Sequence, residues 1–196
     1  MTTPTISPSN EPAPAQTRLE TDVEFDEAVG AWFGNSRRIP LEQMKRNVFR
    51  FDQLPGSPMA FIDAALPGHQ RTLMGALGAG AADENLRSMV EDAQHYHIDF
   101  IRAMPGNGAA LHSHDTEETF ICLTGRWKVT FGDVGEHAVE LGLLDGIVCP
   151  SGIMRSFENI GDGESLLLSI LGGRHPGHVV WAQSIRQKMR DAHGAR

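Results

Sequence analysis

The sequence predicts an all-β domain, either a closed barrel or a sandwich of short antiparallel strands. Between residues 95 and 171, short segments alternate apolar and polar residues, as half-buried strands do. Glycine-containing turns separate these segments at roughly even spacing, which is typical of sandwiches and small barrels. We expect strands at residues 97–103, 118–123, 127–131, 138–141, 146–149, 156–158 and 165–171.

The segments on either side of this region have a different character. Residues 1–20 are rich in Pro, Thr and Ser, and we expect a disordered tail. Residues 21–90 are expected to form an N-terminal extension that packs on the barrel, with a helix over 25–33 and edge strands near 61–63 and 72–74. The barrel is expected at 91–173. Residues 174–196 are expected to supply a C-terminal helix, over 180–193.

Composition excludes several classes of function. The 196 residues carry 17 Lys and Arg against 25 Asp and Glu, a formal net charge of −8, whereas a phosphate-tracking surface is basic; we expect no nucleic-acid partner. The chain shows no run of roughly 18 apolar residues and no signal-peptide pattern, so we expect a cytoplasmic protein with no membrane partner. Cys122 and Cys149 lie in apolar strand-like segments and are expected to be buried thiols.

One short run carries the chemistry: Gly106, His112, His114, Glu118 and Gly125. His112 and His114 are two residues apart, so on an extended segment they point to the same face. Glu118 would lie about 13 Å farther along an extended chain at ~3.3 Å per residue, too far for one ion whose ligand bonds are roughly 2.0–2.2 Å. The chain must therefore turn near Asp115 and Thr116, which brings two imidazoles and a carboxylate together as a candidate metal site.

This run resembles the first conserved motif of the cupin superfamily. Downstream, Asp145, Pro150, Gly152 and Asn159 resemble the second motif, and the resemblance extends from about residue 95 to 173, in the manner of single-domain bacterial cupins. It implies a small double-stranded β-helix, or jelly-roll, barrel that is often a homodimer. It also implies a divalent metal held by His112, His114 and Glu118.

Two positions depart from the family pattern. Leu144 stands where the second motif usually opens with glycine, and Arg155 stands where a third histidine ligand is usual. A guanidinium has no lone pair for a metal. In one arrangement, His112, His114 and Glu118 form a two-histidine, one-carboxylate face with open positions, and Arg155 binds an anionic substrate group. In the other, Arg155 pairs with Glu118, and the barrel is weakly metallated or metal-free and binds an organic anion.

We favour the first arrangement, because two histidines and a glutamate are an odd set for an apolar pocket. It predicts a metal-dependent enzyme, foremost a non-haem Fe(II) dioxygenase acting on a small oxygenated organic acid or diol, with Arg155 as the residue that orients the substrate. Mn, Ni or Zn can occupy the same ligands, and an isomerase or lyase is then the expected activity. A non-catalytic cupin that binds a small organic anion is the alternative.

Further residues are candidates for the pocket wall. Phe120 shares strand parity with Glu118, and Arg102 is either a second anion anchor or a rim charge. Trp127 is a candidate for substrate contact or for a homodimer interface, where large aromatic residues are enriched. Plain core packing is the competing interpretation for these aromatic residues. His97 is a candidate to replace the missing third histidine if its strand face points inward.

Overall fold

The computed structural model describes residues 25–26, 31–32, 40–78, 83, 85–92, 94–173 and 177–193. The chain divides into two compact units, Met1–Leu41 and Glu42–Arg196. In the first unit, β1 (Phe25–Asp26) pairs antiparallel with β2 (Ala31–Trp32). The expected helix over 25–33 is therefore wrong at its described residues, because a short apolar segment can fit either periodicity and Phe and Trp favour strands. The expected tail at 1–20 lies outside the described residues.

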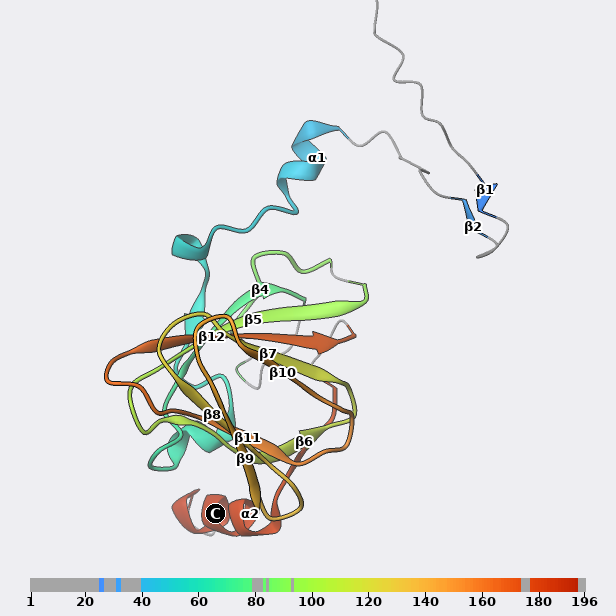
Figure 1. Cartoon of the computed structure of the whole chain (residues 1–196). Helices are drawn as coiled ribbons and strands as arrows, with labels where there is room; N and C mark the ends of the chain where they lie inside the picture. The colour runs from blue at the N-terminus through green and yellow to red at the C-terminus, as the bar shows by residue number, and fades with distance from the viewer. Residues whose placement is uncertain are drawn as a thin grey trace, which may run out of the picture. The chain divides into compact units, whose positions relative to one another are not determined.

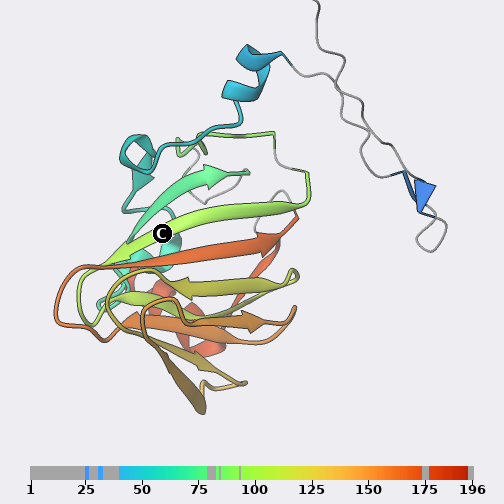
Figure 2. The ribbon, with the colours of Figure 1, turned by 45° about the horizontal axis from the view of Figure 1, so that its top comes forward.

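Two antiparallel sheets form the second unit (Figures 1 and 2). One has the strand order β10-β7-β12-β5-β4-β3 and the other β13-β6-β11-β8-β9. The strands of the first sheet are β3 (Gly56–Ser57), β4 (Thr72–Leu77), β5 (Tyr96–Ala103), β7 (Glu118–Cys122), β10 (Gly146–Cys149) and β12 (Ser165–Gly172). Those of the second are β6 (Gly108–His114), β8 (Trp127–Phe131), β9 (His137–Leu141), β11 (Arg155–Asn159) and β13 (Val179–Trp181).

The core lies between the two sheets. One apolar cluster takes Leu73, Ile101 and Leu167 from the first sheet and Val129 and Phe157 from the second, all buried. Side chains alternate in burial along β5, β7, β11 and β12, so every second residue points into this interior. The expected all-β barrel is therefore confirmed, together with the strands expected between residues 97 and 171.

The expected boundary at residue 90 does not coincide with the edge of the sheet. β4 pairs with β5 from Thr72 to Leu77 and is an internal strand of the six-stranded sheet, not an edge strand. Residues 62–65 form the 3₁₀ helix η2 (Ile62–Ala65) in place of the expected strand at 61–63. This turn buries the carboxylate of Asp63, which accepts hydrogen bonds from Arg71 and from the backbone N–H of Ala110. Sequence periodicity does not reveal such a long-range partner.

Left-handed turns explain the glycines that flank the candidate metal ligands. Gly106 and Gly125 have φ of 74° and 73°, in the region that favours glycine because it has no Cβ. Leu144 has φ of 67° and is the one described non-glycine residue with positive φ. The position where the second motif usually opens with glycine thus keeps the glycine conformation here, although the residue is leucine.

The C-terminal segment joins the second sheet as an edge strand before it becomes helical. Val179–Trp181 pair with β6 as β13, so the helix expected from residue 180 begins later, as α2 (Gln183–His193). Ile185 and Met189 of α2 are buried with Leu66 and Ala110, which fixes the helix against η2 and β6. The remaining short helices are α1 (Leu41–Lys45) and η1 (Phe51–Gln53). Among the described residues, no helix has the length and apolar character to cross a bilayer.

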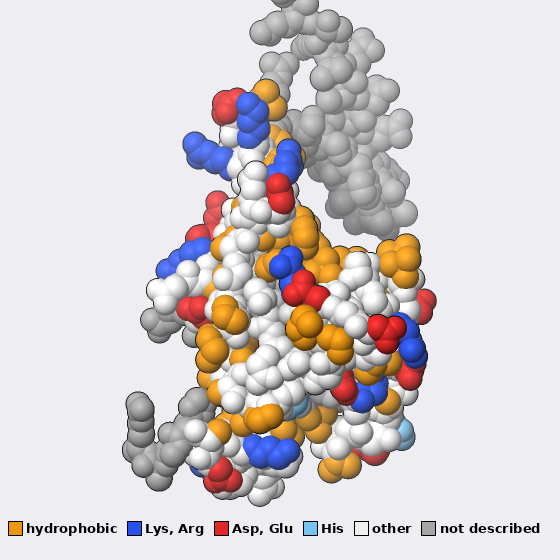
Figure 3. Space-filling view, turned by 90° about the vertical axis from the view of Figure 1, so that its left-hand side faces the viewer, with side chains coloured by type: hydrophobic (Ala, Val, Ile, Leu, Met, Phe, Trp, Pro, Cys, Tyr) orange, Lys and Arg blue, Asp and Glu red, His pale blue; other side chains and the backbone are white. Residues whose placement is uncertain are grey.

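Charges of both signs are interspersed on the outer face of the barrel that Figure 3 draws. Exposed ion pairs include Arg102 with Glu164, Arg126 with Glu140 and Lys128 with Glu158. Such mixed pairs are ordinary features of a solvated surface, and each contributes little to stability.

Candidate metal centre and pocket

His112, His114 and Glu118 converge inside the barrel. Each offers one ligand atom, and these three atoms lie within 4.8 Å of one another. All three side chains are buried, with residue exposures of 6%, 4% and 5%. The two histidines lie on β6 and the glutamate opens β7, so the bend between these strands joins the two halves of the cluster. This is the folding back that the spacing of the three residues required.

His112 is held in one orientation and one tautomer. Its Nδ1 lies 2.6 Å from the carbonyl oxygen of Ala110, and a carbonyl only accepts, so Nδ1 carries the proton and Nε2 keeps its lone pair. Burial, followed by the positive charge of Arg155, holds the pKa of His112 well below its usual value. A neutral imidazole fixed through its second nitrogen is the form in which histidine binds metals.

Glu118 is held on both of its oxygens. Arg155 donates to Oε2 from Nη2 at 2.6 Å and from Nε at 3.0 Å, while Ser169 donates from Oγ to Oε1 at 2.7 Å. His114 Nε2 lies 3.8 Å from the same Oε2. Of the two arrangements considered from the sequence, the structure therefore shows the direct pairing of Arg155 with Glu118, and it shows this within an intact two-histidine, one-carboxylate cluster.

The donor set fits a divalent ion. Two ligand atoms bound to one ion at roughly 2.0–2.2 Å can be no more than about 4.4 Å apart, so His114 and Glu118 meet this limit and the whole cluster needs only a small contraction. Two imidazoles and one carboxylate leave further coordination positions open. Among the described residues, Ser169 donates the hydrogen bond to Glu118 Oε1, which leaves a second lone pair on this oxygen. An ion would have to share the carboxylate with the Arg155 guanidinium.

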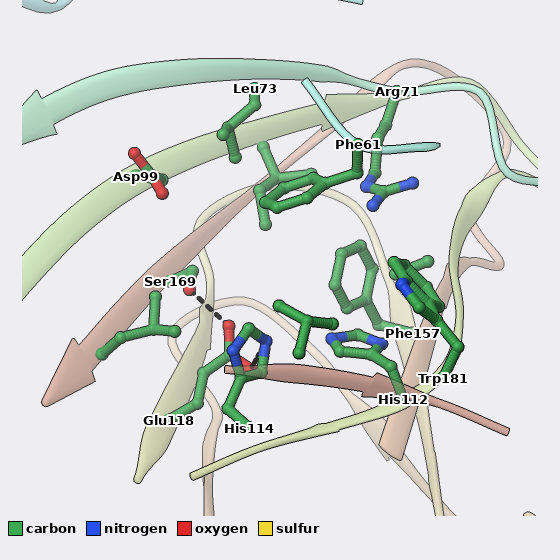
Figure 4. Close-up of a pocket in the computed structure, with 14 residues that line it drawn as sticks. Phe61, Arg71, Leu73, Asp99, His112, His114, Glu118, Phe157, Ser169 and Trp181 are labelled. Carbon is green, nitrogen blue, oxygen red and sulfur yellow. Dashed lines mark hydrogen bonds and ion pairs between the residues drawn. The ribbon is translucent and has the colours of Figure 1, made fainter. Parts of the chain in front are cut away.

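A small pocket opens beside the cluster (Figure 4), with a free volume of about 30 Å³. Phe61, Phe157 and Trp181 supply its aromatic wall. The Trp181 ring packs 5.1 Å from the His112 ring, measured between centroids. Leu73 and Ile101 add aliphatic surface, so an apolar wall faces the polar groups of the cluster across the pocket.

A second buried acidic group of the pocket wall comes from β5. Asp99 lines the pocket, and its Oδ2 lies 2.7 Å from Nε2 of His97. Burial raises the pKa of Asp99, an effect that His97 partly offsets. His97 is thus engaged with Asp99 and does not join the metal cluster, so it does not replace the missing third histidine.

The structure does not bring every candidate residue to the pocket. Arg155 is fully buried behind Glu118, and its Nη1 bonds the Ile153 carbonyl rather than facing the pocket. Arg102 lies on the surface, 41% exposed, 3.4 Å from Glu164. Phe120 and Trp127 are fully buried in the core, where both pack against Phe157 at centroid distances of 5.1 and 5.9 Å. Phe157 separates these two rings from the pocket.

Several residues of the pocket wall were not predicted from the sequence. Asp99 and Ser169 occupy inward positions on β5 and β12, so strand parity alone could have found them. Trp181 comes from a segment that was expected to be helical and lies instead on β13. Arg71 and Phe61 come from the segment expected to lie outside the barrel. Only the pairing of β4 with β5 places that segment at the pocket.

Comparisons with known proteins agree with this architecture. Residues 100–171 match the model of the cupin domain. This stretch holds the three clustered residues and most of both sheets, so the chain contains a cupin domain over these residues. Compared with curated protein sequences, the chain has no significant match.

Several solved structures are similar in fold. The polyketide cyclase RemF from Streptomyces resistomycificus is 15% identical, with 64% of this chain and 78% of that chain covered and a TM-score of 0.49. A conserved protein with a double-stranded β-helix domain from Klebsiella pneumoniae is 19% identical, with 54% and 90% covered and a TM-score of 0.43. An oxalate oxidase is 22% identical, with 44% and 45% covered and a TM-score of 0.40, so the match spans less than half of that chain.

Proposed function

We propose that this cupin is a metal-dependent enzyme in which His112, His114 and Glu118 hold one divalent ion. The observation that carries the proposal is the convergence of the three side chains, together with the fixed, neutral state of His112. Two histidines and one carboxylate with open positions suit non-haem Fe(II), so we propose a dioxygenase acting on a small oxygenated organic acid or diol. Mn, Ni or Zn would instead favour an isomerase or lyase.

The surrounding residues have separable roles in this proposal. When bound, the ion would supply Lewis-acid chemistry and, as iron, redox chemistry. Arg155 and Ser169 act as positioning residues, because their hydrogen bonds fix the plane of the Glu118 carboxylate. Phe157 and Trp181 exclude water from one side of the cluster, which strengthens polar interactions within it. This assignment differs from the sequence expectation, in which Arg155 contacts the substrate directly.

A second candidate is a barrel that binds an organic anion without turnover. The specific observation in its favour is the ion pair between Arg155 and Glu118. A guanidinium beside a ligand carboxylate repels a cation and competes for the same oxygen, so it lowers the affinity for any ion. The two candidates thus differ in one measurable quantity, the metal content of the folded protein.

Elemental analysis of the purified protein tests the proposal. The chain is incubated anaerobically with Fe(II), freed of unbound metal and analysed, in parallel with His114→Ala and with His137→Ala, which removes an exposed histidine of β9 as the matched control. We expect close to one ion per chain in the wild type and in the control, and a large loss in His114→Ala. Absence of metal in the wild type after this treatment would leave the anion-binding candidate.

A further inference from the structure

Arg71 is a buried, charged residue of the pocket wall for which the cluster chemistry has no role so far. It is 6% exposed and precedes β4. Its Nη1 and Nη2 donate to the two oxygens of Asp63 at 3.0 and 2.9 Å. Nη1 also donates to the carbonyls of His69 and Gly108, at 2.9 and 3.1 Å. These bonds fix the outer edge of the guanidinium, formed by Nη1 and Nη2. The side chain has five N–H donors in all.

The other edge of this guanidinium has no protein partner. Nε is buried and makes no hydrogen bond to any described residue, and Nη2 makes only its bond to Asp63. In the planar guanidinium, the Nε hydrogen and one Nη2 hydrogen point in the same direction and form a two-pronged donor edge. A buried donor left unsatisfied is unfavourable, and a native structure with one calls for an explanation.

Arg155 shows what fits such an edge in this barrel. Its Nε and Nη2, the same pair of nitrogens, both donate to the Glu118 carboxylate. The corresponding edge of Arg71 is empty of protein groups, and Arg71 lines the pocket, whereas Arg155 does not. The acceptor chemistry that matches Arg71 is therefore a carboxylate, supplied by a ligand rather than by the chain.

The position of Arg71 makes this edge usable. In Figure 4 its side chain reaches from the upper strand into the pocket beside Phe61, on the same side as His112 and Trp181. Its Cζ lies 5.2 Å from the centre of the Phe61 ring and 5.9 Å from that of Phe157. These rings exclude water from the guanidinium, and hydrogen bonds to a charged partner are stronger in such surroundings.

We propose that Arg71 anchors the carboxylate of a short organic acid, with the carbon chain of the acid against Phe61 and Leu73 and its other end directed to the cluster of His112, His114 and Glu118. The contact between the far end of the acid and the cluster rests on the proposed function. The hydrogen bonding of the carboxylate by Arg71 does not depend on that function. The pocket is small, so the proposal is confined to acids of few carbon atoms.

Charge balance supports an anion as the partner of a metallated pocket. Arg71 with Asp63 and Arg155 with Glu118 are two internally neutral pairs, so neither arginine adds net charge to the pocket. A bound divalent ion would therefore be a large uncompensated charge in the pocket. A carboxylate ligand would compensate part of it, so ion and acid should each raise the affinity of the other.

The test uses propanoate and 3-hydroxypropanoate as probes, with propanamide as the uncharged analogue. In the full-length wild type, the ¹⁵N–¹H resonance of Arg71 Nε, identified by its loss in Arg71→Lys, is followed during titration. We expect it to shift with the two acids and not with the amide. Calorimetry should show at least about tenfold weaker acid binding in Arg71→Lys, since lysine lacks the fork. Arg102→Lys, outside the pocket, is the matched control and should bind like the wild type.

The outcomes separate this proposal from the proposed function. An Nε resonance that stays in place while the acids bind, or equal affinity for acid and amide, would overturn the role of Arg71 whatever the metal content. If the Arg71 Nε resonance shifts with the acids in a protein that takes up no metal, the anchoring by Arg71 is supported and the metal-dependent enzyme is ruled out. If Arg71→Lys fails to fold, the resonance can be identified by triple-resonance assignment of the wild type, and that titration alone decides.

Discussion

The ion pair between Arg155 and Glu118 predicts strong energetic coupling between two buried side chains. The two groups are 0% and 6% exposed at the side chain. Arg155→Met leaves a buried carboxylate without its cation, and Glu118→Gln leaves a buried guanidinium without its anion. Removing one partner of a buried pair costs about 3–5 kcal/mol. At roughly 2–4 °C per kcal/mol for a chain of this size, each single variant should lower Tm by about 6–20 °C.

The double variant distinguishes this explanation from simple loss of packing. With both charges gone, no uncompensated group remains, so Arg155→Met combined with Glu118→Gln should cost at least ~2 kcal/mol less than the sum of the two single changes. Urea unfolding in the presence of EDTA measures the unfolding free energies of the wild type, the two single variants and the double variant without stabilisation by bound metal. The exposed pair Arg126–Glu140, 60% and 59% exposed, is the matched control and should show coupling of about 0–1 kcal/mol. Additive costs at the buried pair would refute the reasoning.

Four further predictions concern the metal cluster, its pH dependence and the turns. Arg155→His removes the guanidinium that competes for the ligand carboxylate, so the protein should retain more metal on dialysis against a weak chelator; unchanged retention would argue against that competition. The pKa of His112 is lowered below 6.5 in the folded state, whereas the unfolded chain keeps the usual value. As the pH falls, the unfolded chain therefore binds one more proton than the folded chain. The metal-free protein should therefore lose up to about 1.4 kcal/mol of unfolding free energy per pH unit as pH falls below 6.5, and His112→Gln should flatten this slope in urea titrations. Burial raises the pKa of Cys149 to about 11 and also raises that of Cys122, so neither thiol should react with Ellman's reagent at pH 8 until the chain is denatured. Leu144 is 72% exposed and has a left-handed backbone conformation that glycine adopts without strain. Leu144→Gly should therefore raise the unfolding free energy by up to about 1 kcal/mol. A less stable variant would contradict the explanation that this backbone is strained.

Alternation along the chain predicted the barrel strands whose inward faces are buried and whose outward faces are not. It did not predict β6, which is buried at nearly every residue and so shows no alternation. Trp127–Phe131 and Gly146–Cys149 have the expected bounds. The prediction was wrong where local pattern and long-range pairing disagree. Residues 179–181 fit a helix locally, yet β6 offers them an open edge. The homodimer remains a prediction, since the structure holds a single chain.

The metal cluster was predictable because its three members lie within seven residues of one another and share one bend. Arg155 was predicted to reach the same site, although its contact with Glu118 depends on the two strands facing each other across the barrel. Arg71 could not be found in this way. Its importance depends on η2, which supplies Asp63, and on the pairing that draws β4 into the sheet.

If both proposals hold, the two buried arginines explain how one interior could hold a metal site and accept an acid. Arg155 and Arg71 each pair with a carboxylate of the chain, but they use different edges of the guanidinium. Arg155 applies its Nε edge to Glu118 and is closed to ligands, whereas Arg71 applies its outer edge to Asp63 and keeps its Nε edge at the pocket. Since both pairs are neutral overall, the specificity for a carboxylate comes from the direction of the donors rather than from excess positive charge. A barrel in a chain of net charge −8 can thereby select an acid without a basic surface around it.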